Sequence, residues 1–275
     1  MARPTIALLT DFGTRDHYAG AMKGVILSLC PDATLVDITH DIAPHDVLSG
    51  ALELAAVYKY FPQGTIFVAV VDPGVGSARR GMAAEAAGYR FVAPDNGLLA
   101  LVLRESPPRK AVELTERRYA RPTVSRTFEG RDRFAPAAAW LAKGIELTAL
   151  GRAMQAWHQL DLPQPVVARR PGPSGPGSNV EEMSGEVLRV DRFGNLVTNI
   201  DRALFERFAA AGAIDITAGM HTVGKVVATY AEAEPGAVCA LFGSSDHLEI
   251  AVNGGNAADT LALTRGARVK ILRFC

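Results

Sequence analysis

The sequence is short of cysteine and carries no excess of charge. Three cysteines, Cys30, Cys239 and Cys275, occur among 275 residues, and none stands in a CxxC pair. This spacing favours neither a zinc site nor a disulfide framework, and it fits a reducing, cytoplasmic compartment. Basic and acidic residues both number 29, so the formal net charge is zero. Without a long-range positive field, we expect neither nucleic acid nor a membrane surface as a partner.

Long apolar runs are also missing. No window of 18 apolar residues occurs, so we expect no transmembrane helix. The apolar stretch near the amino terminus is short and ends at Asp11, which argues against a signal peptide. Hydrophobic residues still make up 48% of the chain and charged residues 21%. That balance is typical of a globular protein with a sizeable core.

Residues 1–161 alternate between strand-like and helix-like segments. Runs of β-branched and apolar residues predict strands, and apolar positions at helical spacing predict helices. The expected strands are Ile6–Thr10, Thr34–Ile38, Thr65–Val71 and Tyr89–Ala93, and the expected helices are His17–Leu29, Val47–Phe61, Asn96–Arg104 and Phe134–Lys143. This order predicts an N-terminal α/β domain with a doubly wound, mostly parallel sheet.

The pattern changes after residue 161. Residues 162–180 are rich in proline, glycine and serine, which predicts a linker. Residues 181–275 contain short strand-like runs separated by turn residues, which indicates a smaller antiparallel β-barrel or sandwich. The expected strands are Gly185–Val190, Leu196–Asn199, Ala213–Thr217, Thr222–Val227, Ala237–Phe242, His247–Ala251 and Val269–Leu272.

Polar clusters follow all four expected strands of the N-terminal domain. They comprise Thr10–Gly13, Asp37–Asp46, Asp72–Ser77 and Pro94–Gly97. Ligands of open α/β sheets bind at the carboxyl ends of the strands. A single acidic residue there often only caps a helix, but four clusters on one edge favour a binding site.

Two alternative interpretations of these clusters carry less support. Gly74-Val75-Gly76 lacks the third glycine and the following helix of a dinucleotide-binding fingerprint, so a tight turn is favoured. The stretch His40–Asp46 holds two His-Asp pairs but no helical i, i+4 pair, so a metal site is disfavoured. Asp191–Asn195 and Gly243–Asp246, taken singly, are typical of β-turns.

Six segments in one order together closely resemble a known family. They are LLTDFGTRDHYAGAMKG, VVDPGVGSARR, APDNGLL, TFEGRDRFAPAAA, DRFGNLVTNI and FGSSDHLEIAVNGGNA. The series resembles the SAM hydrolase (SAM hydroxide adenosyltransferase) family, where SAM is S-adenosyl-L-methionine, which is related to the 5′-fluorinase and 5′-chlorinase. The resemblance implies an α/β domain followed by a β-barrel, and a homotrimer with SAM between neighbouring subunits. It implies no cofactor, because SAM is the substrate.

The resemblance also implies a set of substrate-binding residues. A carboxylate at position 11 would accept hydrogen bonds from both ribose hydroxyls. The implied residues are Asp11 and His45 at the ribose, Asp191 at the methionine ammonium, Asn195 and Ser244 at the amino-acid end, Tyr230 and Asn253 at adenine, and Asn96 and Phe193 within the matching motifs.

The implied reacting centre is Asp72. Halogenating relatives carry Tyr at this position, whereas hydrolases carry Asp followed seven residues later by Arg, here Arg79. A carboxylate would repel a halide and accept a proton from water. The resemblance therefore implies that activated water breaks the C5′–S bond of SAM, giving adenosine and L-methionine. Arg79 would keep Asp72 ionised and oriented.

Glu129 departs from the family pattern, which usually has His in this place. The Glu could be the base, could share a proton with Asp72, or could pair with Arg79. Three rival functions stay open: a halide-dependent SAM adenosyltransferase, a non-catalytic SAM- or adenosine-binding module, and a metal-dependent phosphohydrolase that uses the His40–Asp46 cluster.

Overall fold

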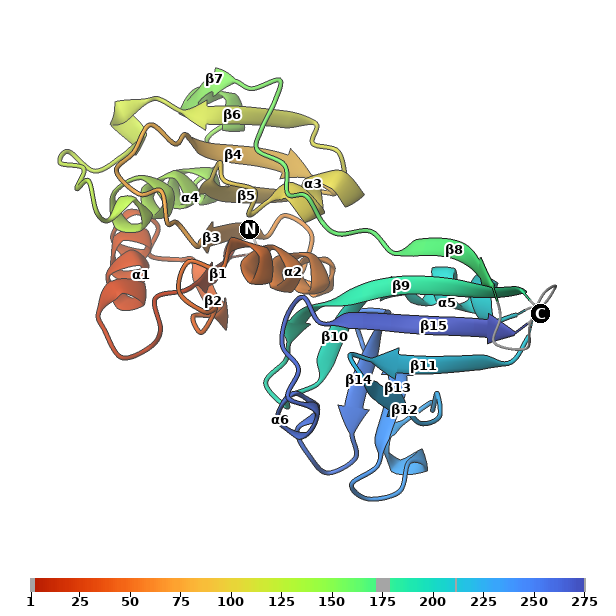
Figure 1. The fold of residues 1–275 in the computed structure, drawn as a ribbon. Helices are drawn as coiled ribbons and strands as arrows, with labels where there is room; N and C mark the ends of the chain where they lie inside the picture. Colours follow the sequence, from red (N-terminus) through yellow and green to blue (C-terminus); the bar gives the residue numbers. More distant parts are fainter. Residues whose placement is uncertain (1–2, 172–178, 211, 275) are drawn as a thin grey trace. The chain divides into compact units, whose positions relative to one another are not determined.

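The chain divides into two compact units, an N-terminal unit of residues 1–160 and a C-terminal unit of residues 161–275. The computed structural model describes residues 3–171, 179–210 and 212–274 (Figure 1). Among these residues, none of the helices combines the length and apolar character that a membrane span requires.

The N-terminal unit is built on a mixed sheet with strand order β2-β1-β3-β5-β4-β6-β7. Neighbouring strands among the first four are parallel, and the remaining pairs are antiparallel. The strands are β1 (Thr5–Thr10), β2 (Thr34–Thr39), β3 (Ile66–Val70), β4 (Gly81–Ala86), β5 (Tyr89–Pro94), β6 (Lys110–Leu114) and β7 (Gly151–Ala153). The α/β prediction is confirmed, with an antiparallel extension that the sequence reasoning did not include.

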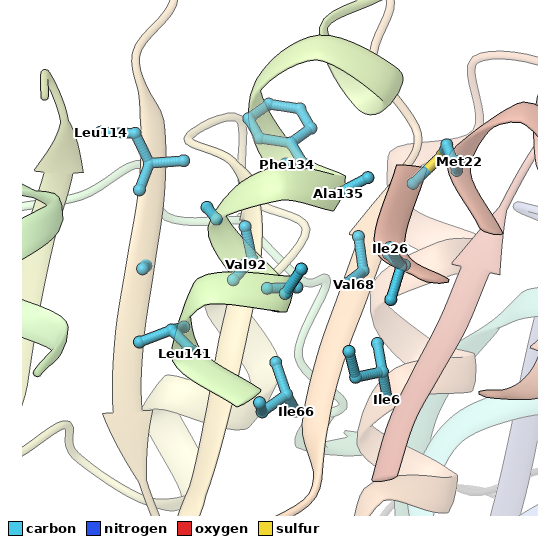
Figure 2. Close-up of a cluster of buried hydrophobic side chains, with 14 of the residues drawn as sticks. Ile6, Met22, Ile26, Ile66, Val68, Val92, Leu114, Phe134, Ala135 and Leu141 are labelled. Carbon is cyan, nitrogen blue, oxygen red and sulfur yellow. The ribbon is translucent and has the colours of Figure 1, made fainter. Parts of the chain in front are cut away.

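Helices cover both faces of this sheet. They are α1 (Tyr18–Leu29), α2 (Val47–Val57), α3 (Ala100–Glu105) and α4 (Ala135–Ala142). Side chains alternate along β1, so Ile6 and Leu8 pack with α1 and α4, whereas Ala7 and Leu9 pack with α2 and α3. Figure 2 shows the first of these two cores. Burial on both faces explains the continuous apolar runs of β1 and β3.

Helix boundaries differ from expectation, and the helix expected over Val47–Phe61 ends at Val57. The helix expected over Asn96–Arg104 begins only at Ala100, because Asn96 and Gly97 form a turn in which Gly97 has a φ of 100°. A π-helical turn over Gly130–Phe134 precedes α4. Short 3₁₀ segments lie at Tyr58–Tyr60, Arg117–Tyr119 and Leu147–Leu150.

The C-terminal unit is a nearly closed antiparallel barrel with strand order β12-β11-β15-β9-β10-β14-β13, as expected. The strands are β8 (Val166–Pro171), β9 (Asn179–Val190), β10 (Leu196–Asp201), β11 (Ile214–Ala218), β12 (His221–Val223), β13 (Val238–Phe242), β14 (His247–Val252) and β15 (Arg268–Phe274). After β12, the Gly224 amide donates to the Val238 carbonyl and the Val227 amide to the Ala240 carbonyl, which joins the two ends of the sheet. Helices α5 (Arg202–Ala209) and α6 (Ala257–Leu261) and a 3₁₀ turn over Tyr230–Glu232 complete the unit.

The range 162–180, expected as a linker, is partly strand. Val166–Pro171 forms β8, which pairs antiparallel with β9, and β9 itself begins at Asn179. Val166 and Val167 have the β-branched side chains that a strand favours. The linker prediction was wrong for these residues because it rested on proline content. Residues 172–178 lie outside the described residues.

Candidate active site

A cavity of about 310 Å³ lies at the carboxyl ends of β1 and β3 in the N-terminal unit. Four of the residues singled out from the sequence line it: Asp11, His45, Asp72 and Glu129. The parallel strands end on the same edge of the sheet, which brings together segments far apart in the chain. The volume is at the lower end of the range for small-molecule sites.

Asp72, Arg79 and Glu129 form one ion-paired group. Nη2 of Arg79 lies 2.5 Å from Oδ2 of Asp72 and 2.7 Å from Oε2 of Glu129. All three side chains are nearly buried, with Asp72 only 5% exposed. The Arg79 guanidinium also lies over the ring of Phe134, 5.5 Å from its centroid. A buried guanidinium shared by two carboxylates holds both in a fixed geometry.

A second arginine holds the other oxygen of Glu129. Nη1 of Arg133 donates to Oε1 at 2.9 Å, and Nη2 of the same guanidinium donates to the Leu114 carbonyl. Glu129 and Arg133 are four residues apart around the π-helical turn. Both oxygens of Glu129 therefore accept from guanidinium groups, which fixes the carboxylate in the wall of the cavity.

The environment of Asp72 favours its protonated form more than water does. Burial raises the pKa of Asp72, the charge and hydrogen bond of Arg79 oppose that effect, and the charge of Glu129 adds to it, so the pKa lies above its ordinary value. Oδ1 of Asp72 is buried and has no hydrogen-bond partner among the described residues. This oxygen is thus the one in the group that is left to accept a hydrogen.

The loop that carries Asp72 packs closely against the segment that carries Glu129. Gly76 has a φ of 77°, and a Cβ built on it would lie 2.3 Å from the carbonyl oxygen of Arg126. Glycine is therefore required here both by the backbone angle and by the contact.

Asp11 lines the cavity and is hydrogen-bonded to the loop that carries His45. Its Oδ2 accepts from the backbone amide of His45 at 2.9 Å, and His45 has a positive φ of 69°. Below it, the buried Thr10 hydroxyl lies 2.8 Å from Nδ1 of His40 and accepts from the Phe12 amide. These bonds fix the backbone on both sides of the Asp11 carboxylate.

Three aromatic side chains that sequence reasoning did not single out also line the cavity. Phe12, Tyr18 and Phe128 contact one another, with ring centroids 5.1 to 5.8 Å apart. Each lies inside or next to a matching motif, but aromatic residues at such spacing are equally typical of a core. Their flat apolar surfaces suit a planar or apolar part of a ligand.

Asn96 does not line this cavity. Its Nδ2 donates to the Val71 carbonyl at 2.8 Å, and its Oδ1 accepts from the Leu98 amide at 3.2 Å. The metal interpretation of His40–Asp46 also finds no support, because the part of the chain that the structure describes contains no cluster of three His, Cys, Asp or Glu side chains suited to a metal.

The C-terminal unit brings Asp191, Asn195 and Tyr230 together. Nδ2 of Asn195 donates to Oδ2 of Asp191 at 2.9 Å and to the Tyr230 hydroxyl at 3.2 Å. That hydroxyl in turn lies 3.4 Å from Oε2 of Glu249, a buried residue of β14. Glu249 was missed by sequence reasoning, although a single charge inside the apolar run HLEIAV is an available signal.

Negative charge accumulates in this second group. Burial and the neighbouring Asp191 raise the pKa of Glu249, opposed by the charge of Arg189. Burial and the same two carboxylates raise the pKa of Tyr230. Two carboxylates, Asp191 and Glu249, that are linked through Asn195 and the Tyr230 hydroxyl suit a cationic group.

The other three expected residues of this unit lie in turns. Phe193 is 76% exposed in the turn after β9. Ser244 is exposed in the turn between β13 and β14. Nδ2 of Asn253 donates to the Ala233 carbonyl at 2.6 Å, which ties it to the segment that follows Tyr230.

Comparison with known proteins gives consistent relatives over nearly the whole chain. An (R)-S-adenosyl-L-methionine hydrolase from Salinispora tropica is 38% identical over 269 residues, which cover 98% of this chain and 97% of the relative. One of the same name from Thermus thermophilus is 37% identical over 275 residues, with 97% and 99% covered. A fluorinase from Actinoplanes is 33% identical over 228 residues, 74% of each chain.

Solved structures give the same result. A crystal structure of an uncharacterized conserved protein from Thermotoga maritima has a TM-score of 0.87 and 33% identity, covering 97% of this chain and 99% of that one. The model of the SAM hydroxide adenosyltransferase N-terminal domain matches residues 6–151, and that of the C-terminal domain matches residues 185–270. The chain therefore belongs to the SAM hydroxide adenosyltransferase family.

Proposed function

We propose that this chain is a SAM hydrolase, an enzyme that uses water to break the C5′–S bond of SAM and releases adenosine and L-methionine. The observation that carries the proposal is a buried Asp72, held by Arg79, at the wall of the cavity in the N-terminal unit. The names of the relatives support the same reaction.

Asp72 is the group that accepts the proton of water in this proposal. A lone pair of the water oxygen forms the bond to C5′ while the C5′–S bond breaks, and its electron pair returns to sulfur. The sulfonium loses its charge, so no acid is needed at the leaving group. The proton passes to the carboxylate of Asp72, whose raised pKa makes it a stronger base than an exposed aspartate.

Glu129 acts through Arg79 rather than as the base. Both of its oxygens accept from arginines, which hold the carboxylate in place. Glu129 instead supplies the negative charge that keeps the Arg79 guanidinium in place. Arg79 and Glu129 are positioning residues, and Asp72 is the catalytic residue.

Two carboxylates in the cavity wall argue against a halide as the nucleophile. A halide approaching C5′ would meet the negative charge of Asp72 and of Glu129 across a poorly hydrated wall. The fluorinase relative is 33% identical, compared with 37% and 38% for the two hydrolases. Water, being neutral, meets no such repulsion.

Other residues hold the substrate. Asp11 binds the ribose hydroxyls beside His45, and the aromatic side chains of the cavity flank the nucleoside. Asp191 and Asn195 bind the methionine ammonium, with Ser244 and Phe193 near it. Tyr230 and Asn253 bind adenine.

We propose further that three copies of the chain assemble as a homotrimer in the cytoplasm, with SAM between subunits. Light scattering after size exclusion tests the assembly.

Product analysis tests the function. Purified protein incubated with SAM should release adenosine and L-methionine in equal amounts by chromatography, and Asp72→Asn should not. If neither product forms with the wild type, hydrolysis is wrong. Tight SAM binding in calorimetry together with that result would identify a non-catalytic binding module.

A further inference from the structure

The turn that follows β5 lies against both ends of the loop of residues 71–80, which carries Asp72 and Arg79. We propose that Asp95 and Asn96 form a clamp that positions this loop, so that both are positioning residues for the reaction. The inference rests on the proposed function and assigns Asn96 to the loop rather than to the substrate.

Asp95 holds the far end of the loop. Its Oδ2 accepts from Nε of Arg80 at 2.9 Å and from Nη2 at 2.5 Å. The Asp95 side chain is only 5% exposed. Its other oxygen, Oδ1, accepts from the His158 amide at 2.7 Å, which anchors it to the segment before the second unit. A buried, fully bonded carboxylate has little freedom to move.

One atom, the carbonyl oxygen of Arg80, connects the backbone of Asp95 to the group that contains Arg79 and Asp72. The carbonyl oxygen of Arg80 accepts both the backbone amide of Asp95, at 2.9 Å, and Nη1 of Arg79, at 2.8 Å. The other amino group of that Arg79 guanidinium binds Asp72 and Glu129. Displacement of the Arg80 carbonyl would therefore turn the guanidinium on which Asp72 depends.

Asn96 holds the near end. Its Nδ2 donates to the carbonyl of Val71, the residue directly before Asp72. This contact is possible because β3 and β5 are parallel neighbours, with Val68 beside Val92, so that their carboxyl ends emerge side by side. Adjacent clamp residues thus grip the two ends of a loop ten residues long.

The middle of the loop is held by its own turn. The Ser77 hydroxyl donates to the Gly74 carbonyl at 2.6 Å and accepts from the Arg79 amide at 3.2 Å. With the turn fixed internally and Gly76 packed against the Arg126 carbonyl, the contacts at the two ends set the position of the loop relative to β5. The clamp supplies both end contacts.

Three variants test the clamp without large changes in volume. Asp95→Asn removes the charge that binds Arg80, Arg80→Gln removes the same pair from the loop side, and Asn96→Asp replaces the donor to Val71 with an acceptor. The matched control is Tyr89→Phe, which removes a bond to the Phe61 carbonyl at the other end of β5. Thermal unfolding of all four shows which are folded.

The clamp predicts a loss in kcat with little change in KM. Misplaced Arg79 and Asp72 should lower kcat about tenfold to a hundredfold in the clamp variants, while Tyr89→Phe stays within twofold of wild type. Arg79 lowers the pKa of Asp72 and so counteracts the effect of burial. When Arg79 is no longer held in place it does so less strongly, and the pKa of Asp72 should rise. The acid limb of the kcat profile should then move to higher pH, which loss of folded protein alone cannot do.

Carbon-13 NMR titration of the Asp72 carboxyl gives a readout independent of turnover, with Asp72→Asn as the assignment control. The Asp72 pKa should rise in Asp95→Asn, although this variant removes a negative charge, and stay at the wild-type value in Tyr89→Phe. An unchanged or lowered Asp72 pKa in Asp95→Asn overturns the clamp, even if the wild type hydrolyses SAM. Absence of products from wild type, with shifted titrations, overturns hydrolysis and leaves the clamp standing.

Discussion

Oε2 of Glu129 lies 2.7 Å from Nη2 of Arg79, the nitrogen that also binds Asp72. Two carboxylates therefore share one donor, and the charge of Glu129 disfavours ionisation of Asp72. The charge of Glu129 raises the pKa of Asp72, and that of Arg79 lowers it. Glu129 and Arg79 thus shift the pKa of Asp72, the proposed base, in opposite directions, and each effect can be removed by its own substitution.

Glu129→Gln should move the acid limb of kcat to lower pH. The proposed base works only when ionised, so kcat rises with pH through the Asp72 pKa, which lies above its ordinary 3.8. Removal of the Glu129 charge removes one cause of the raised pKa. The Arg79 guanidinium, which lowers that pKa, still binds Asp72. The measurement is kcat against pH, with loss of some maximal rate expected as well.

Arg79→Gln is the opposing case. Without the guanidinium, burial and Glu129 act on Asp72 unopposed, so the limb should move to higher pH. His45→Gln controls for a histidine at the same cavity and should leave the limb in place. Shifts of Glu129→Gln and Arg79→Gln in the same direction would contradict the proposed arrangement.

Asp72→Asn should lower kcat by about 10²- to 10⁴-fold, the range for loss of a general base. The amide keeps the shape of the side chain and an acceptor for Arg79 but cannot take the proton of water. Quenched-flow or chromatographic assays measure kcat, and SAM binding by calorimetry shows that the site is intact. Full activity in this variant would remove Asp72 from the mechanism.

Glu249→Gln should stabilise the fold at neutral pH. The pKa of Glu249 is raised above 4.5, so the folded state binds its proton more tightly than the unfolded state. Its ionised form is therefore destabilising, by an amount that grows as pH rises from 4.5 through the folded pKa. Glutamine still accepts the hydrogen bond from Tyr230.

Thermal unfolding at a series of pH values checks this prediction. The melting temperature of Glu249→Gln should exceed that of wild type near pH 8 and converge with it below pH 4.5. Glu206→Gln, at an exposed position 3.9 Å from Arg202, should change stability little at any pH. A Glu249→Gln protein that melts lower near pH 8 would contradict the sign.

Chloride should yield no halogenated product. Excess chloride in the assay should leave adenosine as the nucleoside product by mass spectrometry, because Asp72 and Glu129 both repel an anion. EDTA should leave kcat unchanged. Formation of 5′-chloro-5′-deoxyadenosine would favour the halide-dependent transferase, and loss of activity with EDTA would favour the metal-dependent phosphohydrolase.

Strands β1 and β3 could be predicted from the sequence because they contain β-branched residues and are buried on both faces. By contrast, β4 reads GMAAEA, which has no β-branched residue, and β7 has three residues, so periodicity gives no signal for either. Their pairing is decided by tertiary packing. The same limit applies to β8, where proline content hid a strand.

At the site, the sequence could identify residues but few of their partners. The family resemblance implied that Arg79 pairs with Asp72, and the structure brings them together. The sequence left Glu129 with three possible roles. Its contact with Arg133 forms across a π-helical turn, which no sequence pattern predicts. Glu249 and Asn96 depend on which strands are neighbours, and that is a property of the whole sheet.

Gly76 has a consequence for redesign of the nucleophile. Because its α-carbon lies against the Arg126 carbonyl, the two walls that hold Asp72 and Glu129 meet with no space between them. A larger residue at position 76 would push residues 71–80 and residues 125–130 apart. A change in one of these segments therefore requires a change in the other. Variants selected for another nucleophile should therefore accumulate paired changes, one in residues 71–80 and one in residues 125–130, and libraries that randomise a single loop should fail.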